Sequence, residues 1–543
     1  MDTFLSARRE LLKKGGMGLA AAAVAAVPSA YAAPKSSSLT VTPNIFDIRT
    51  FGAVGDGKTV DSPAINKAIE AASAAGGGTV LFPAGTWLSF SIRLKSHVNL
   101  FLSQGATLLA ADSPKAGETT GYNGGTYDAA EPKTEWDAYQ DYGHNHWHNS
   151  LIWGEGIQDV SITGPGLIWG KGLSRGTRTG FVAEQAGVGN KAIALKNCRN
   201  VMFRDFSILK GGHFGLLLTG VDNMTIDNLM IDTDRDGIDI DCCKNVRVSN
   251  CFVNSPWDDG ICPKSSYALG YAKPTENLTI TNCVMTGYYE LGTVIDGTFK
   301  KFAPDFRVPR NGRIKCGTES NGGFKNITIS NIVFEGSMGL ALESVDGALC
   351  EDVAISNITM RDGVNGPLFL RLGGRLRGPK ESTKVGTLRR VVVNNLVSYN
   401  GSSHIGSIIS GIPGYAIQDL KVSNVYIQHV GGAAAETAKI VMQENVEQYP
   451  DPQRFGADTP TQGFFLRHID RVEMSHVEVQ PMQPDPRPSF YLEGVNRADF
   501  IAVTAPTSAE APAFHLNKVT DLRIALSRAA KDTQMATADG QTL

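Results

Sequence analysis

One short pattern recurs along this sequence, as Asn200-Val201-Met202-Phe203, Asn223-Met224-Thr225-Ile226 and Asn245-Val246-Arg247-Val248. Each copy is an asparagine followed by alternating apolar residues, which is typical of a short strand that buries one face. The second and third copies begin 23 and 22 residues after the copies before them. Further, more widely spaced copies begin at Asn277, Asn326, Asp352, Asp419, Asp470 and Asp521. A period of about 22 to 25 residues predicts a solenoid, in which each coil stacks on the next.

The length and composition of the repeat indicate which solenoid this is. Leucine-rich repeats share the period but need a leucine consensus, which is absent, and propeller blades need about forty residues. We therefore predict an all-β fold, a right-handed parallel β-helix with two or three short strands in each coil. The recurrent asparagines would line up at turns, where their side chains can bond the backbone.

The sequences at the two ends of the predicted solenoid do not follow the repeat. Asp61-Ser62-Pro63-Ala64 is typical of a helix start, and Ile65, Ala68 and Ile69 follow at helical spacing. A helix there would cap the first coil, whose unpaired backbone would otherwise be exposed. The β-helix catalytic domain is predicted to span 44–530, and the tail at 531–543 is expected to be disordered.

The first 32 residues carry the features of an export signal. Arg8 and Arg9 precede a small, apolar run over residues 15–27, and Ala30-Tyr31-Ala32 offers a cleavage site. Paired arginines before a weakly hydrophobic run resemble a bacterial twin-arginine signal, and an ordinary secretory signal is the alternative. Either signal predicts a periplasmic or secreted protein.

The composition of the chain indicates which classes of binding partner it does not favour. A net charge of -3 over 543 residues does not indicate a nucleic-acid binder, which would carry a basic surface. No stretch after the signal is long and apolar enough to span a bilayer. The eight cysteines are expected to be interior thiols that act as small hydrophobic residues. The flanks of a β-helix carry no clear interface signature, so the sequence makes no prediction of oligomeric state.

Counting from the repeat asparagines brings carboxylates into register. Thirteen residues after Asn200, Asn223, Asn245 and Asn277 stand His213, Asp236, Asp258 and Glu290. Equal offsets would stack these side chains about 4.8 Å apart on neighbouring coils. Such a row of acids is unfavourable unless a carboxyl changes its pKa or cations bind. Glycoside hydrolysis uses such an arrangement, with one acid to protonate the leaving oxygen and another to activate water. Turn chemistry at Asp236-Gly237 and Asp259-Gly260 is the structural alternative.

Several of these residues resemble a known family. Phe51-Gly52-Ala53-Val54-Gly55-Asp56-Gly57 and Phe82-Pro83-Ala84-Gly85 are similar to the start of pectin-degrading β-helix proteins. Asp234-Arg235-Asp236-Gly237-Ile238-Asp239 and Trp257-Asp258-Asp259-Gly260-Ile261 resemble the first two motifs of glycoside hydrolase family 28, the polygalacturonases and rhamnogalacturonan hydrolases. The resemblance implies an inverting mechanism without a cofactor or metal. It also implies that Asp258 is the general acid and that Asp236 and Asp259 hold and activate the water.

The chain departs from the family pattern at three places. Arg235 replaces the small residue of the usual Asn-Thr-Asp, and the region of the expected Gly-His-Gly reads Tyr288-Tyr289-Glu290-Leu291-Gly292. The family's Arg-Ile-Lys is found as Arg313-Ile314-Lys315, after an insertion at 298–311, and we expect both cations to reach the cleft. The predicted substrate contacts are His213, Arg235, Lys264, Glu290, Arg313 and Lys315.

Two other sets of residues are candidates for binding. His144, His146 and His148 alternate as they would on one face of a strand, and could hold zinc, or could belong to a sugar-contacting loop with Tyr142 and Trp147. The second set consists of four cations, Lys264, Arg371, Arg375 and Arg377. These side chains could bind the carboxylates of a uronic substrate, or could simply be solvated charges on the surface.

The function predicted is inverting hydrolysis of a pectin-type, galacturonate-containing polysaccharide or oligosaccharide. Insertions at 117–150 and 298–312 could close the cleft, which favours release of sugars from chain ends. Two alternatives use the same scaffold. One is a polysaccharide lyase that needs calcium, and the other is a β-helix that binds carbohydrate without catalysis.

Overall fold

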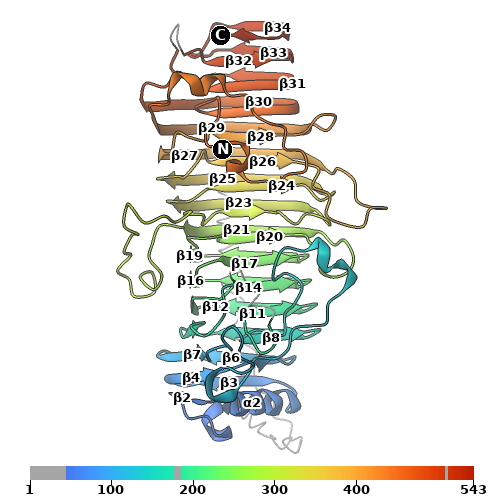
Figure 1. Ribbon diagram of the computed structural model, residues 1–543, viewed down its shortest axis with the longest axis vertical. Coiled ribbons are helices and arrows are strands. Elements are labelled where there is room, and N and C mark those ends of the chain that lie inside the picture. The colour runs from blue at the N-terminus through green and yellow to red at the C-terminus, as the bar shows by residue number, and fades with distance from the viewer. Residues whose placement is uncertain (1–43, 177–184, 508–510) are drawn as a thin grey trace, which may run out of the picture. The chain divides into compact units, whose positions relative to one another are not determined.

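The computed structural model describes residues 44–176, 185–507 and 511–543. The predicted signal at 1–32 lies outside these residues. Asn44–Leu543 form one unit, an elongated stack of coils (Figure 1). Its strands pair in parallel from one coil to the next, and the right-handed parallel β-helix is confirmed.

Three strand ladders run along the coils. The ladder that carries the repeat asparagines comprises β3 (Gly78–Phe82), β6 (Val98–Leu102), β9 (Gln158–Thr163), β12 (Arg199–Arg204), β15 (Asp222–Asp227) and β18 (Lys244–Ser249). The next comprises β2 (Asp56–Val60), β4 (Gly85–Ser89), β7 (Ala106–Ala110), β10 (Leu167–Trp169), β13 (Ser207–Leu209), β16 (Met230–Asp232) and β19 (Phe252–Asn254). From β21 (Thr275–Thr286) onward one long strand serves both ladders, as in β23 (Phe324–Glu335), β25 (Leu349–Arg361), β27 (Thr387–Gly401), β29 (Ile417–Gly431) and β30 (Phe464–Gln483).

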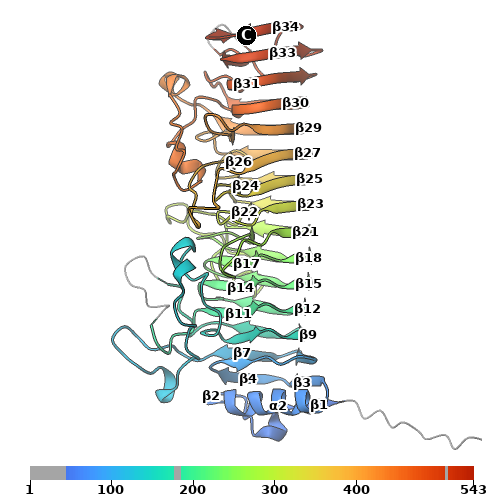
Figure 2. The same cartoon turned by 90° about the vertical axis from the view of Figure 1, so that its right-hand side faces the viewer.

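The third ladder positions the site. It comprises β5 (Ile92–Arg93), β8 (Ile152–Glu155), β11 (Lys191–Lys196), β14 (Phe214–Thr219), β17 (Asp236–Asp241), β20 (Ile261–Lys264), β22 (Ile314–Cys316), β24 (Leu340–Ser344), β26 (Leu368–Leu372) and β28 (Ser407–Ser410). It continues through the starts of β30 and β31 (Phe490–Ile501) into β32 (Phe514–Asn517). The longest loops that join the coils, with the short 3-10 helices η2 (Tyr122–Gly124), η3 (Glu135–Tyr139), η5 (Ala435–Lys439) and η6 (Pro452–Phe455), project on one side of the stack (Figure 2).

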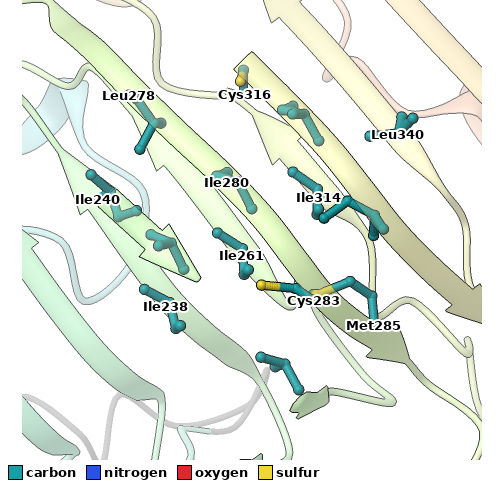
Figure 3. Packing of buried hydrophobic residues seen from close by; sticks show 14 of the residues in the cluster. Ile238, Ile240, Ile261, Leu278, Ile280, Cys283, Met285, Ile314, Cys316 and Leu340 are labelled. Carbon is teal, nitrogen blue, oxygen red and sulfur yellow. The ribbon is translucent and has the colours of Figure 1, made fainter. Parts of the chain in front are cut away.

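The interior of the coils is a continuous ladder of aliphatic residues. Ile238, Ile261, Ile314 and Leu340 are successive partners in the third ladder and are fully or almost fully buried (Figure 3). Each such side chain contributes roughly 1.5 to 3 kcal/mol when it leaves water. All eight cysteines are free and buried, which confirms that they act as interior hydrophobic residues.

The repeat asparagines stand at the second position of strands β12, β15 and β18 and not at turns, and their side chains bond one another rather than the backbone. Asn200, Asn223 and Asn245 have φ of 56°, 56° and 59°, a left-handed conformation that asparagine tolerates better than most residues. The Asn223 amide donates to Oδ1 of Asn200 at 2.8 Å, and the Asn277 amide donates to Oδ1 of Asn245 at 2.9 Å. These bonds hold successive coils in register.

Both ends of the stack are covered. The capping helix α2 (Ser62–Ala74) buries Ile65 and Ile69 beside β1 (Ile45–Asp47) and the 3-10 helix η1 (Ile48–Phe51). At the other end, β34 (Thr533–Ala538) pairs antiparallel with β33 (Val519–Ala525), and β35 (Gln541–Thr542) pairs with β32. The disorder expected at 531–543 is therefore wrong, because these residues turn back and satisfy the open edge of the last coil. Of the helices in the described ranges, none combines the length and the apolar character that a bilayer crossing needs.

Candidate active site

A cavity of about 750 Å³ opens on the third ladder, near the middle of the stack. Its floor holds Asp236, Asp258 and Lys264. Three segments that are distant in sequence supply its walls, around 141–144, 309–315 and 449–454. The cavity therefore exists only because the solenoid stacks these coils and loops together.

Three carboxylates converge on the cavity floor. Asp236 begins β17, and Asp258 and Asp259 lie in the turn before β20. Each offers an oxygen within 4.8 Å of an oxygen of the other two. Ile238 pairs with Ile261, so Asp259, and not Asp258, stands opposite Asp236. The sequence count was off by one residue, because the turns before the two strands differ in length.

Asp259 is held as an anion by two buried cations. Its Oδ1 lies 2.5 Å from Nε of Arg313, and its Oδ2 contacts Nζ of Lys315. Burial alone would raise the pKa of this carboxyl, but Arg313 and Lys315 together hold it well below its usual range. Both cations also line the cavity, so the structure places Arg313 and Lys315 where the sequence predicted.

The pKa of Asp236 is shifted in the opposite direction to that of Asp259. Burial raises its pKa well above the usual value, and the neighbouring charge of Asp258 raises it further. The nearest cation, Nζ of Lys264, is 3.8 Å from Oδ2 and only partly offsets this. The cleft therefore contains one carboxyl that favours a proton beside one that is ionised.

Asp258 is bonded by Arg235, the residue that replaces the small one of the family motif. The guanidinium Nη2 lies 2.6 Å from Oδ2 of Asp258, and both side chains are partly exposed. The hydroxyl of Ser255 donates to the backbone carbonyls of both Arg235 and Asp258. The buried Ser255 thus links the backbones of Arg235 and Asp258, whose side chains face each other.

The three histidines of the 144–148 segment do not converge. His144, in the cavity wall, bridges Asp239 at 3.0 Å and Glu319 at 2.5 Å, and His148 lies 3.0 Å from Glu155. The remaining one, His146, contacts the side chains of Asn145 and Asn190. Within the described residues, no cluster of possible metal ligands includes two of these histidines. Of the aromatic residues proposed beside them, Tyr142 lines the cavity, whereas Trp147 is buried under Lys196.

Burial and two neighbouring carboxylates together determine the protonation state of His144. Desolvation alone would lower the pKa of His144, but the charge of Glu319 and a hydrogen bond that the ring donates to Asp239 raise it to about 10. The nearby Lys264, which lies 3.9 Å from Asp239, limits this rise. A positive imidazolium and a lysine thus both line the cavity beside its carboxylates.

His213 reaches the cavity by a different route from the one predicted. Its two ring nitrogens lie 2.9 Å from the carbonyl of Arg175 and 3.1 Å from the carbonyl of Tyr142. Phe214, and not His213, pairs with Asp236 in the ladder. Burial lowers the pKa of His213 well below its usual value, so the ring is neutral and donates to one carbonyl only.

Glu290 does not belong to the site. It lies in the loop between β21 and β22, where its carboxylate pairs with Lys300 at 2.9 Å, and it does not line the cavity. The prediction was wrong because a long insertion follows β21. The next strand of the third ladder is therefore β22, and the thirteenth residue after Asn277 lies in the loop before that strand.

The arginines proposed for uronic carboxylates hold loops instead. Arg375 pairs with Asp346, and Arg377 lies 2.6 Å from Asp141 in the cavity wall. Arg371 is buried and donates to backbone carbonyls of the loop after β29. None of the three lines the cavity.

That same loop supplies cavity residues that the sequence did not reveal. Tyr449, Asp451 and Arg454 face the cavity, and Oδ2 of Asp451 lies 3.7 Å from Nη2 of Arg313. The loop has no repeat pattern, so no count could have brought it to the site.

Comparison with known families fits this geometry. Residues 45–143 match the model of rhamnogalacturonase A/epimerase, pectate lyase-like, and residues 117–288 match that of glycosyl hydrolases family 28. The second match includes Asp236, Asp258 and Asp259. These matches support glycoside hydrolase family 28.

Similar proteins include a probable polygalacturonase of Vitis vinifera, 27% identical over 52% of the chain and 60% of the grape protein. An exo-poly-alpha-D-galacturonosidase of Dickeya chrysanthemi is 24% identical over 46% of each protein. The chain thus spans about half the length of these relatives. Among solved structures, an exopolygalacturonase of Thermotoga maritima superposes with a TM-score of 0.57 at 18% identity, over 80% of this chain and 91% of that one. This similarity shows the shared fold.

Proposed function

We propose that the protein is an inverting glycoside hydrolase that acts on a pectin-type, galacturonate-containing chain. The observation that carries the proposal is the trio of carboxylates at the cavity floor, each with an oxygen within 4.8 Å of an oxygen of the other two. Glycosidic hydrolysis needs a proton donor for the leaving oxygen and a base for water. The cations that surround the trio suit a substrate that carries carboxylates of its own.

The roles follow the family motifs position by position. Asp258, the most exposed of the trio, would protonate the leaving oxygen, and Asp236 with Asp259 would hold and activate the attacking water. Arg313 and Lys315 would fix Asp259 in place. No cofactor is needed in this scheme, because every proton moves between carboxyls, water and sugar.

Release of sugars from a chain end is part of the proposal. The walls at 141–144 and 449–454 bound a cavity of about 750 Å³, which is within the usual range for sites of small molecules. Two of the named relatives are exo-acting. A short oligosaccharide end fits such a site better than the middle of a long polymer.

A panel of polysaccharides with product analysis tests the reaction. Polygalacturonan, rhamnogalacturonan and a neutral galactan are incubated with the protein and with Asp258→Asn, and new reducing ends and product lengths are followed over time. We expect saturated mono- or disaccharides from the galacturonate substrates at early times, and none with the variant. Long oligomers early in the digest would contradict end-on action.

The same panel separates the alternatives. A lyase would give an unsaturated product that absorbs in the ultraviolet, and a chelator would abolish it if calcium were required. A carbohydrate-binding protein without catalysis would bind the polymers and release nothing. Either result would overturn the proposed hydrolysis.

We also propose export through the segment at 1–32. The paired arginines Arg8 and Arg9 and the apolar run that follows support the twin-arginine route. Fractionation of cells that produce the full chain tests this, with replacement of both arginines by lysine. The variant should remain in the cytoplasm, and unchanged export would favour an ordinary secretory signal.

A further inference from the structure

Two buried arginines of the third ladder hold one stretch of loop by its backbone. Arg371 of β26 and Arg467 of β30 are 1% and 0% exposed. Ser410 stands between them in the ladder, and its hydroxyl accepts a hydrogen bond from each guanidinium. The two arginines also donate, at 2.7 to 3.0 Å, to four consecutive carbonyls of the loop after β29, those of Met442, Gln443, Glu444 and Asn445.

The far end of the same loop returns to Arg371. The guanidinium of Arg371 lies 5.1 Å from the centre of the Phe455 ring, and the Asn445 amide donates to the carbonyl of Arg454 at 2.9 Å. Residues 442–455, which we call the wall loop, are therefore held at both ends. Between these ends stand the cavity residues Tyr449, Asp451, Gln453 and Arg454.

The charge on these arginines makes the attachment strong. Burial and the charge of Arg467 lower the pKa of Arg371 only to about 10, so its guanidinium is charged at neutral pH. A buried cation is unfavourable unless hydrogen bonds replace its lost hydration, and the carbonyls of the wall loop supply them. Hydrogen bonds from a charged donor are about twice as strong as neutral ones. The arginines and the loop therefore order each other.

Both arginines bind backbone oxygens of the wall loop, so their hold does not use the side chains that the loop presents to the cavity. Oδ2 of Asp451 lies 3.7 Å from Nη2 of Arg313, which pairs with Asp259. The position of the wall loop thus affects the substrate-facing wall and the surroundings of the catalytic carboxylates together.

We propose that Arg371 and Arg467 are positioning residues, which fix the wall loop so that its cavity side chains meet the substrate without first having to be ordered. Neither arginine lines the cavity. The kinetic part of this inference rests on the proposed hydrolysis, whereas the attachment of the loop can be measured without turnover.

Hydrogen exchange followed by mass spectrometry tests the attachment. Arg371→Met removes the donors and fills the space with an unbranched apolar side chain. Because it also removes a buried charge that Arg467 repels, the variant should still fold. Amides of the wall loop should exchange roughly tenfold faster or more, and those of the distant β12 should not change. Arg371→Lys keeps the charge with fewer donors and should lie between the two proteins.

Kinetics on a galacturonate oligomer test the positioning. In Arg371→Met, KM should rise roughly 10- to 100-fold, because the substrate must then order the loop itself. At saturation the loop is ordered again, so kcat should stay within about threefold. Arg471→Gln is the matched control: it removes an arginine of the same strand as Arg467 that is 48% exposed and outside the cavity, and should alter neither constant.

A double-mutant cycle separates positioning from a general loss of stability. Arg454→Gln should raise KM roughly tenfold in the wild type, but by less than about threefold in Arg371→Met, where the loop no longer holds Arg454 in place. Equal factors in the two backgrounds would overturn the proposal, as would an unchanged KM in folded Arg371→Met, or no effect of Arg454→Gln in the wild type. Unchanged exchange in the wall loop would refute the attachment itself. If the wild type cleaves no galacturonate oligomer, the proposed hydrolysis fails, and the exchange measurement still decides whether the arginines hold the loop.

Discussion

Replacing Asp259 with asparagine should loosen the coils around the cavity as well as stop turnover. Arg313 and Lys315 are buried cations that both pair with Asp259, and the substitution leaves Lys315 without a paired carboxylate and Arg313 with only Asp451, at 3.7 Å. Loss of one partner from a buried ion pair destabilises by about 3 to 5 kcal/mol. Since about 1.4 kcal/mol is a factor of ten, amides that open with these coils should exchange roughly 100- to several-thousand-fold faster.

Hydrogen exchange followed by mass spectrometry measures this locally, which suits a long solenoid whose unfolding is not two-state. The effect should be confined to peptides that contain β20 and β22, and exchange in the distant β31 should not change. Asp258→Asn is the matched control, because its pair with Arg235 is 34% and 22% exposed and such pairs contribute about 0 to 1 kcal/mol. It should alter exchange by less than about fivefold while abolishing turnover. If Asp259→Asn exchanged as slowly as the wild type, the two cations would not depend on Asp259, and our account of the buried cluster would be refuted.

Three further predictions concern residues around the site. Glu290→Gln should leave kcat and KM unchanged, because Glu290 pairs with Lys300 outside the cavity, and a loss of activity would return it to the site. Glu319 and Asp239 raise the pKa of His144 to about 10, so the stability that the imidazolium contributes should be complete below about pH 6.5 and lost as the pH rises through 10. In His144→Gln the thermal midpoint should lack this decline, and a parallel decline in both proteins would contradict it. Burial raises the pKa of Glu343 to about 7, so Glu343→Gln should raise the thermal midpoint at pH 8.5 and leave it almost unchanged at pH 4.5. The reverse order would show that the ionised form is the stabilised one.

Where coil length is regular, the sequence was sufficient to predict the fold and most of the site. The asparagines at 200, 223 and 245 define coils of 23 and 22 residues, and all three stand at equivalent, left-handed positions of neighbouring strands. Because these coils are uniform, a count along the chain brought Asp236 and the Asp258-Asp259 pair to one floor, within a single residue of the true register. Strand pairing corrected the count, since turns of unequal length shift the residues that precede a strand.

Where an insertion interrupts a coil, counting fails. Glu290 was assigned to the row of acids because the loop after β21 was taken for the next strand. Tyr449 and Asp451 could not be found at all, since a loop without a repeat pattern can cross any coil of the stack. Arg313 and Lys315 were placed correctly only through their resemblance to the family motif, because the same insertion precedes them.

The stereochemistry of the first product tests the central claim most directly. The claim is that the carboxylates at 236, 258 and 259 act as an acid and a base on opposite sides of one sugar bond, with water between them. NMR of the anomeric protons during the first minutes of digestion of an alpha-linked galacturonan should show the β-anomer before mutarotation adds the α-form. An α-anomer formed first would place a covalent intermediate on one of these carboxylates and contradict the account.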